Sequence, residues 1–316
     1  MALLKQEHIT FHVGLPKSAS TTLQKYFYKA APDRFLGHEN SSTLSEHFLL
    51  VTKALELDLE ELSTAVNEEM GEHPWLFSSE FCSSYWTPLS GAHPQSVKKI
   101  ASRLYTLAPH AKVLVILRNP FKMMESLYSQ LLFNESYALS PRSLSYEEWL
   151  DRNILLTEKG WQSAFDLLNY SRLIKAYSQF PNLEVRFLEE VSKDFDAFMN
   201  DWLVPWTKME VSEDYRSSQE NTRHTSCEIF AKRIIRRSLN KIKRAFPSLV
   251  SSVPETTLQK FESLWNGFIL RLPGSMKNLK VRKDQKEWMH RHFLGLNAGL
   301  PDELKAKAKE FGYPVK

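Results

Sequence analysis

The sequence is poor in cysteine and lacks any long apolar run, and both deficits narrow the class of protein. Its 316 residues include only two cysteines, Cys82 and Cys227, which are far apart and form no Cys-x-x-Cys spacing. This usage disfavours a disulfide or zinc scaffold and points to a reducing compartment. No stretch reaches the roughly 18 consecutive apolar residues of a membrane span, and charged residues interrupt the N-terminal segment before an apolar signal-peptide core builds. We therefore expect a cytoplasmic protein without a transmembrane segment.

A strong charge of one sign is also absent. Lysine and arginine together number 41 and aspartate and glutamate 37, which leaves a formal net charge of +4. This balance is too weak to indicate a nucleic-acid partner, although a slight positive excess suits an anionic ligand. His8 and His12 lie four positions apart, which on a strand places them on the same face but too far apart to share a metal ion. His290 and His292 form a second pair, which has no third ligand nearby. We therefore expect no metal site.

The order of apolar patterns along the chain indicates its fold class. There is no repeat at a period of roughly 20 to 50 residues and no linker rich in glycine, serine or proline. Four short apolar runs predict buried strands, at residues 9–13, 75–77, 113–117 and 183–187. Helical patterns lie between or beside them, at residues 21–30, 44–70, 96–107, 121–133 and 162–179. This alternation is typical of an α/β protein with a parallel sheet.

Strand patterns disappear after about residue 190, and amphipathic helical patterns replace them. These patterns fall at residues 194–203, 224–246, 255–271 and 302–311. We therefore expect one domain over residues 1–316, with an α/β core at 8–190 and a mainly helical cover at 191–316.

The segment after the first predicted strand has the features of a phosphate-binding loop. It runs from Gly14 to Gln24, opens a predicted helix and carries Lys17 followed by three hydroxyl residues, Ser20, Thr21 and Thr22. The free N–H groups and the dipole of a helix N-terminus favour anions. The segment has no second glycine and therefore does not match the nucleotide-triphosphate loop, which disfavours a kinase or GTPase. The alternative is a plain hydroxyl N-cap beside an incidental lysine.

A second candidate segment follows the third predicted strand. Arg118 ends the strand, Asn119 is suited to cap the next helix, and Pro120 suits its first position. Arg118 and Ser126 supply a planar cation and a hydroxyl for a second phosphate. The alternative is that Arg118 pairs with a carboxylate and Ser126 is a surface hydroxyl.

Together the two segments resemble the sulfotransferase family, whose members use 3′-phosphoadenosine-5′-phosphosulfate (PAPS) as sulfuryl donor. The first resembles the family's 5′-phosphosulfate loop, P-K-[ST]-G-T-T, and the second its 3′-phosphate motif, R-[ND]-P followed by a serine. Looser similarity to bacterial-type members continues at residues 181–189, Glu220-Asn221 and Leu239-Asn240. Ala19 stands where the family has glycine, so a positive φ is not expected there. The donor-binding residues that the resemblance implies are Lys17, Ser18, Ala19, Ser20, Thr21, Thr22, Arg118 and Ser126.

The resemblance implies a three-layer, P-loop-like fold and transfer of a sulfuryl group from PAPS to an acceptor hydroxyl without a metal ion. In-line transfer needs the growing charge on the leaving phosphate to be neutralised, and we assign this role to Lys17. Family members place the base near the end of the second predicted strand, which favours Glu80. The alternative is a structural Glu80 that caps a helix or forms a salt bridge.

Several interpretations stay open at this point. A nucleotide-dependent kinase and a non-catalytic nucleotide-binding protein with the same fold are the alternatives to a sulfotransferase. The acceptor is a carbohydrate, a lipid-like alcohol or a small metabolite. The basic helix at residues 233–244 either packs on the core with a solvated face or contacts an anionic acceptor. Five aromatic residues either line the acceptor pocket or belong to the core: Tyr85, Trp86, Tyr128, Phe133 and Tyr137.

Overall fold

The structure is a computed structural model of the whole chain, and its described part is divided into two compact units. It describes residues 9–15, 18, 23–24, 35–37, 63–64, 67–68, 75–83, 97–133, 144–208 and 279–316. The first unit comprises Met1–Met123, Leu167–Asn221 and His290–Lys316, and the second comprises Met124–Asp166 and Thr222–Met289. The expected single domain, with its division near residue 190, stays a prediction.

The first unit contains a five-stranded sheet in the order β2-β3-β1-β4-β5, and every pairing in it is parallel. The strands are β1 (Ile9–Val13), β2 (Phe35–Gly37), β3 (Trp75–Ser79), β4 (Lys112–Leu117) and β5 (Asn182–Phe187). The four predicted strands are confirmed, and β3 extends two residues past its predicted end. The sequence did not reveal β2, because three residues are too few to show a strand pattern. The residues of β1 are buried throughout, as expected for a central parallel strand.

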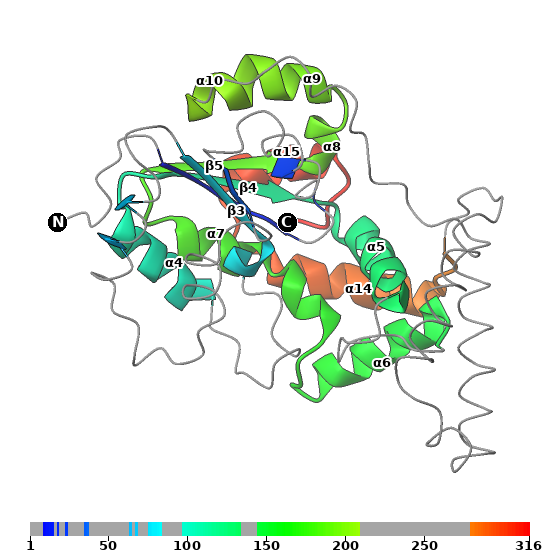
Figure 1. The fold of residues 1–316 in the computed structure, drawn as a ribbon. Coiled ribbons are helices and arrows are strands. Elements are labelled where there is room, and N and C mark those ends of the chain that lie inside the picture. The colour runs from blue at the N-terminus through cyan, green and yellow to red at the C-terminus, as the bar shows by residue number, and fades with distance from the viewer. Residues whose placement is uncertain are drawn as a thin grey trace, which may run out of the picture. The chain divides into compact units, whose positions relative to one another are not determined.

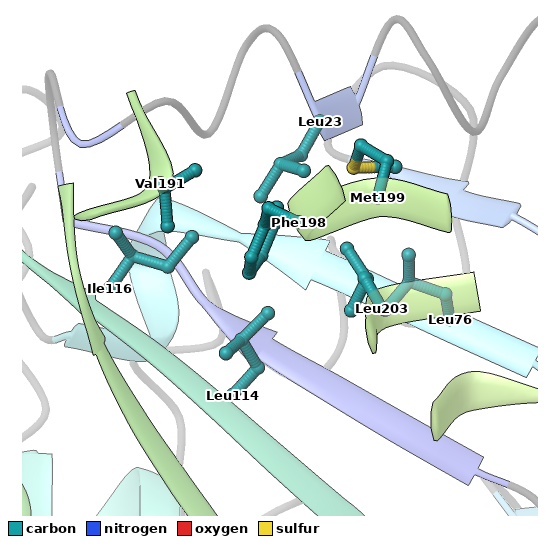
Figure 2. Packing of buried hydrophobic residues seen from close by; sticks show 8 residues of the cluster. All are labelled: Leu23, Leu76, Leu114, Ile116, Val191, Phe198, Met199 and Leu203. Atoms are coloured by element: carbon teal, nitrogen blue, oxygen red, sulfur yellow. The ribbon is translucent and has the colours of Figure 1, made fainter. Parts of the chain in front are cut away.

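One face of the sheet packs against a helical segment that follows β5. This segment is made of α8 (Leu188–Val191), α9 (Phe195–Ala197), the π-helical turn η5 (Phe198–Leu203) and α10 (Val204–Thr207). Leucine and isoleucine side chains of β3 and β4 meet the segment in one apolar cluster, which Leu23 joins (Figure 2). The members of the cluster are Leu23, Leu76, Leu114, Ile116, Val191, Phe198, Met199 and Leu203.

The opposite face is covered by α4 (Val97–Leu107) and α7 (Tyr170–Tyr177) (Figure 1). The ring of Phe11 on β1 makes edge contacts with Phe77 and Phe180, each at a centroid distance of 6.2 Å. Tyr105 of α4 reaches the same Phe180 ring at 5.3 Å. Helices therefore lie on both faces of the sheet, and the expected three-layer α/β fold is confirmed.

The helix prediction for residues 162–179 was wrong in one respect, because the segment is two helices. A short 3-10 helix, η4 (Ala164–Leu168), precedes α7, and Asn169 separates them. The Asn169 side chain accepts a hydrogen bond from the Arg172 N–H at 2.9 Å and so caps α7. The helices predicted at 96–107, 121–133 and 302–311 are confirmed as α4, α5 (Pro120–Phe133) and α15 (Asp302–Glu310).

Other helix predictions fall wholly or largely on residues that the structure does not describe. Those at 224–246 and 255–271 lie outside the described residues, and only a few helical positions are described within 21–30 and 44–70. The helix predicted at 194–203 is confirmed in a more irregular form, as α9 and η5, and continues through α10.

The second unit contains α6 (Tyr146–Glu158) and the first half of α14 (Lys283–Leu296), two helices that were not predicted from the sequence. Ser145 and Glu148 form a capping box at the start of α6, with each side chain accepting from the other residue's N–H. Arg282, just before α14, forms a bidentate ion pair with Asp151 at 2.7 and 2.9 Å. None of the helices in the described part of the chain is long and apolar enough to cross a membrane.

Candidate active site

The three segments singled out in the sequence follow three neighbouring strands. β1 lies between β3 and β4, and Val13 is paired with Ser79 on one side and Val115 on the other. The Gly14 N–H donates to the Ser79 carbonyl oxygen at 3.2 Å, which ties the start of the loop to the end of β3. Because parallel strands end at the same edge of a sheet, all three segments begin at its carboxyl edge, where α/β proteins bind ligands.

Only part of the candidate phosphate-binding segment after β1 lies within the described residues. Ser18 lies in a turn, is fully buried and donates its N–H to the Leu15 carbonyl oxygen at 3.1 Å. Its hydroxyl has no hydrogen-bond partner within the described part of the chain. A buried hydroxyl of this kind suits a ligand oxygen. The remaining predicted residues of the loop lie outside the described residues: Lys17, Ala19, Ser20, Thr21 and Thr22.

Glu80, the predicted base, is the first residue of the 3-10 helix η3 (Glu80–Ser83), directly after β3. α7 holds this helix, because the buried Tyr177 hydroxyl donates to the Cys82 carbonyl oxygen at 2.7 Å. Burial raises the pKa of the Cys82 thiol, so this cysteine is protonated and unsuited to act as a nucleophile at neutral pH. The role of Glu80 stays a prediction.

Arg118 follows β4 at the same edge, and only 6% of its surface is exposed. Asn119 caps α5 as expected, with its Oδ1 accepting from the Phe121 N–H at 3.1 Å, and Pro120 is the first helical residue. The buried Tyr170 hydroxyl donates to the Arg118 carbonyl oxygen at 2.5 Å. The backbone at Arg118 is thus fixed from two elements, β4 and α7.

Ser126, the predicted partner of Arg118, lies on α5 and is half-buried. It belongs to the second compact unit, whereas Arg118 belongs to the first. Their joint binding of one phosphate therefore stays a prediction.

A buried polar network beneath the site escaped the sequence analysis. The His12 Nδ1 and the Ser78 hydroxyl share a hydrogen bond of 2.7 Å between β1 and β3. The Gln24 side-chain amide donates to the Ser78 carbonyl at 3.2 Å and to its hydroxyl at 3.3 Å. Burial lowers the pKa of His12 to about 4, so the imidazole is neutral at neutral pH. These hydrogen bonds connect both strands to Gln24, the last residue of the candidate phosphate-binding segment. The sequence signal for this network is a polar residue within each apolar strand, His12 in β1 and Ser78 in β3.

Within the described residues, no cluster of three or more histidine, cysteine, aspartate or glutamate side chains is placed to hold a metal ion.

Another contact that the sequence did not reveal lies beside Arg118, where the Glu189 carboxylate accepts a hydrogen bond from the Asn119 N–H at 2.9 Å. Nothing local in the sequence connects these two residues, because they lie on different elements.

The fold and the edge described above define a parallel α/β protein with a candidate anion-binding site. No family model and no curated protein matches the chain. Among solved structures, the chain is similar to a sulfotransferase from Alicyclobacillus acidocaldarius, with 18% identity, a TM-score of 0.44 and coverage of 73% of this chain and 94% of that one. It is also similar to a mouse sulfotransferase in complex with PAP (3′-phosphoadenosine-5′-phosphate), with 14% identity, a TM-score of 0.44 and coverage of 98% of this chain and 90% of that one. A third similar structure is the sulfotransferase domain from the curacin biosynthetic pathway, with 13% identity, a TM-score of 0.37 and coverage of 68% and 78%.

Proposed function

We propose that the protein is a sulfotransferase that moves the sulfuryl group of PAPS to the hydroxyl of an acceptor. The observation that carries this proposal is the parallel pairing of β1 with β4. Because of this pairing, the loop that begins at Gly14 and the segment that begins at Arg118 start at the same edge of the sheet. Two anion-binding segments on adjacent strands suit a ligand with two phosphate groups. The sequence motifs of both segments supply the chemical identity of that ligand.

The proposed chemistry is an in-line displacement at sulfur. The acceptor oxygen forms the new S–O bond while the bond from sulfur to the bridging oxygen of the 5′-phosphate breaks, and that phosphate leaves with the electron pair. Lys17 and the hydroxyls of Ser20, Thr21 and Thr22 neutralise the charge on the leaving phosphate. The acceptor proton passes to the carboxylate of Glu80, the general base.

Arg118 has the properties needed to bind the 3′-phosphate. Its guanidinium carries a permanent charge, its side chain is nearly buried, and its backbone is held at the carboxyl end of β4. A dianionic phosphate is a suitable partner for such a cation, because a bidentate hydrogen-bonded pair satisfies both groups. Ser126 adds a hydroxyl donor to the same phosphate in this proposal.

Calorimetric titration without metal tests the proposal directly. The ligands are 3′-phosphoadenosine-5′-phosphate (PAP), adenosine-5′-phosphate, which lacks the 3′-phosphate, and ATP as the control. We expect tight binding of PAP and a loss of affinity of at least about 100-fold when the 3′-phosphate is absent. Equal affinity for the two adenosine nucleotides, or a preference for magnesium ATP, would contradict the sulfotransferase assignment and favour the kinase alternative.

Turnover distinguishes the enzyme from a catalytically idle nucleotide-binding protein. PAPS labelled in its sulfuryl group should transfer the label to members of an acceptor panel of carbohydrates, lipid-like alcohols and small hydroxylated metabolites. Transfer that Glu80→Gln abolishes supports the proposed mechanism. PAP binding without transfer to any acceptor favours the idle protein.

A further inference from the structure

The C-terminal segment Phe311–Tyr313 is hydrogen-bonded to the loop that carries Arg118. The Asn119 side-chain amide donates to the carbonyl oxygens of Phe311 and Gly312, both at 3.1 Å. Gly312 has a φ of +71°, a conformation that favours glycine. It turns the chain at the end of α15, where the N–H groups of Gly312 and Tyr313 return to the carbonyls of Lys309 and Ala308. The segment therefore has a built turn that presents two carbonyls to Asn119.

Glu189 joins the same loop and the same segment through its two carboxylate oxygens. Oε1 accepts from the Asn119 N–H at 2.9 Å, and Oε2 accepts from the Tyr313 hydroxyl at 2.8 Å. Only 4% of the Tyr313 surface is exposed. The carboxylate bonds thus lie at the border of the core, where hydrogen bonds to a charged acceptor are strong.

Aromatic packing holds this C-terminal segment against β5 and α7. The centroid of the Phe187 ring lies 5.2 Å from that of Tyr313 and 5.6 Å from that of Phe311. The ring centroids of Tyr170 and Tyr313 are 6.3 Å apart. Tyr170 is the residue whose hydroxyl donates to the Arg118 carbonyl. The two tyrosines therefore reach the Arg118 loop from adjacent positions, one directly and one through Glu189.

The peptide group between Arg118 and Asn119 is held at both of its polar atoms. Its carbonyl oxygen accepts from Tyr170, and its N–H donates to Glu189. This peptide plane sets the backbone torsion from which the Arg118 side chain departs. A bidentate contact between a guanidinium and a phosphate depends on direction, and small displacements of the supporting backbone weaken it.

We infer that Glu189, Tyr170 and the segment Phe311–Tyr313 form a latch that positions Arg118 for the 3′-phosphate of the donor, and that this latch sets the preference for 3′-phosphorylated nucleotides. The inference rests on the proposed function. The latch residues are positioning residues, because they act on the nucleotide through the peptide group and the side chain of Arg118.

The test compares affinities for PAP and adenosine-5′-phosphate by calorimetry in the full chain and its variants. Tyr313→Phe removes the donor to Glu189, and Tyr170→Phe removes the donor to the Arg118 carbonyl. Each should reduce the ratio of the two affinities about fivefold, and a chain that ends at Glu310 should reduce it at least about tenfold. Affinity for adenosine-5′-phosphate should not change.

Thr207→Val is the matched control, because it also removes a buried hydroxyl that donates to a backbone carbonyl, that of Leu203 at 2.9 Å. Its affinity ratio should equal that of the unmodified protein. The latch is refuted if the tyrosine variants keep that ratio, or if both affinities fall in parallel, as a general loss of structure would cause. If the unmodified protein shows no preference for the 3′-phosphate, the donor assignment fails and takes the role of the latch with it.

Discussion

The backbone N–H of Gly14 donates a hydrogen bond to the carbonyl oxygen of Ser79 at 3.2 Å. Gly14 begins the loop that contains Lys17, and Ser79 immediately precedes Glu80. One backbone contact therefore joins the two segments to which we assign the charge-neutralising lysine and the general base. Substituting each of these two residues separately therefore tests the two proposed roles.

Lys17→Ala and Arg118→Ala should have different kinetic effects. Loss of Lys17 should reduce kcat about 100- to 1000-fold with a moderate loss of donor affinity, because the charge it neutralises grows in the transition state. Loss of Arg118 should mainly weaken PAP binding, by about 10- to 100-fold, because the 3′-phosphate does not change during the reaction. Steady-state kinetics and calorimetry measure the two effects. Equal losses of kcat with unchanged donor affinity would refute this division.

Glu80→Gln should reduce kcat about 100- to 10 000-fold, because the amide cannot accept the acceptor proton. PAP affinity should stay within about twofold of the unmodified protein, since Glu80 contacts the acceptor in the proposed mechanism. Glu303→Gln, which changes an exposed carboxylate on α15, is the control and should leave the rate unchanged. An unchanged rate for Glu80→Gln would remove this residue from the mechanism.

His12 should make the protein less stable below neutral pH. Its pKa is about 4 in the folded chain against an ordinary value of 6.5, so between these pH values the unfolded chain binds a proton that the folded chain does not. The free energy of unfolding should therefore fall as the pH drops from 6.5 to about 4, with a contribution from His12 of about 3 kcal/mol. Urea unfolding of the protein and of His12→Gln across this range measures the contribution.

The stability difference between the protein and His12→Gln should narrow as the pH falls, because the variant has no imidazole at this position. His110→Gln, which changes an exposed imidazole, should give a curve parallel to that of the unmodified protein. A constant difference between the protein and His12→Gln from pH 7.5 to 4.5 would show that the buried imidazole does not resist protonation.

The same glycine-to-alanine change should alter the free energy of unfolding in opposite directions at two positions near the C-terminus. Gly312→Ala should lower the free energy of unfolding by about 1 kcal/mol, because alanine is strained at a φ of +71°. Gly295→Ala should raise it by about 0.5 to 1 kcal/mol, because Gly295 lies inside helix α14 and its added Cβ meets nothing within 4 Å. Thermal unfolding of both variants decides this, and a stabilising Gly312→Ala would argue against the turn described for the latch.

The sequence allowed the strands nearest the site to be predicted because each forms its own apolar run. β4 (Lys112–Leu117) is buried from Val113 onward, so its pattern needs no knowledge of its neighbours. The cap at Asn119 and the start of α5 at Pro120 were predictable for a similar reason, since both depend on adjacent residues. The sequence also carries a capping-box signal for α6 at Ser145 and Glu148, although no helix was predicted there.

The chemical character of the two candidate phosphate segments was determined by the sequence alone, because lysine, arginine and hydroxyl residues at those spacings carry it in any fold that places them after strands. The tertiary structure alone decided what surrounds them. Asn119 meets Glu189 and Phe311, 70 and 192 positions away, and Glu189 meets Tyr313, 124 positions away. Hydrogen bonds over such separations leave no periodicity or motif in a single sequence, since they arise only when the sheet and its C-terminal segment have packed together.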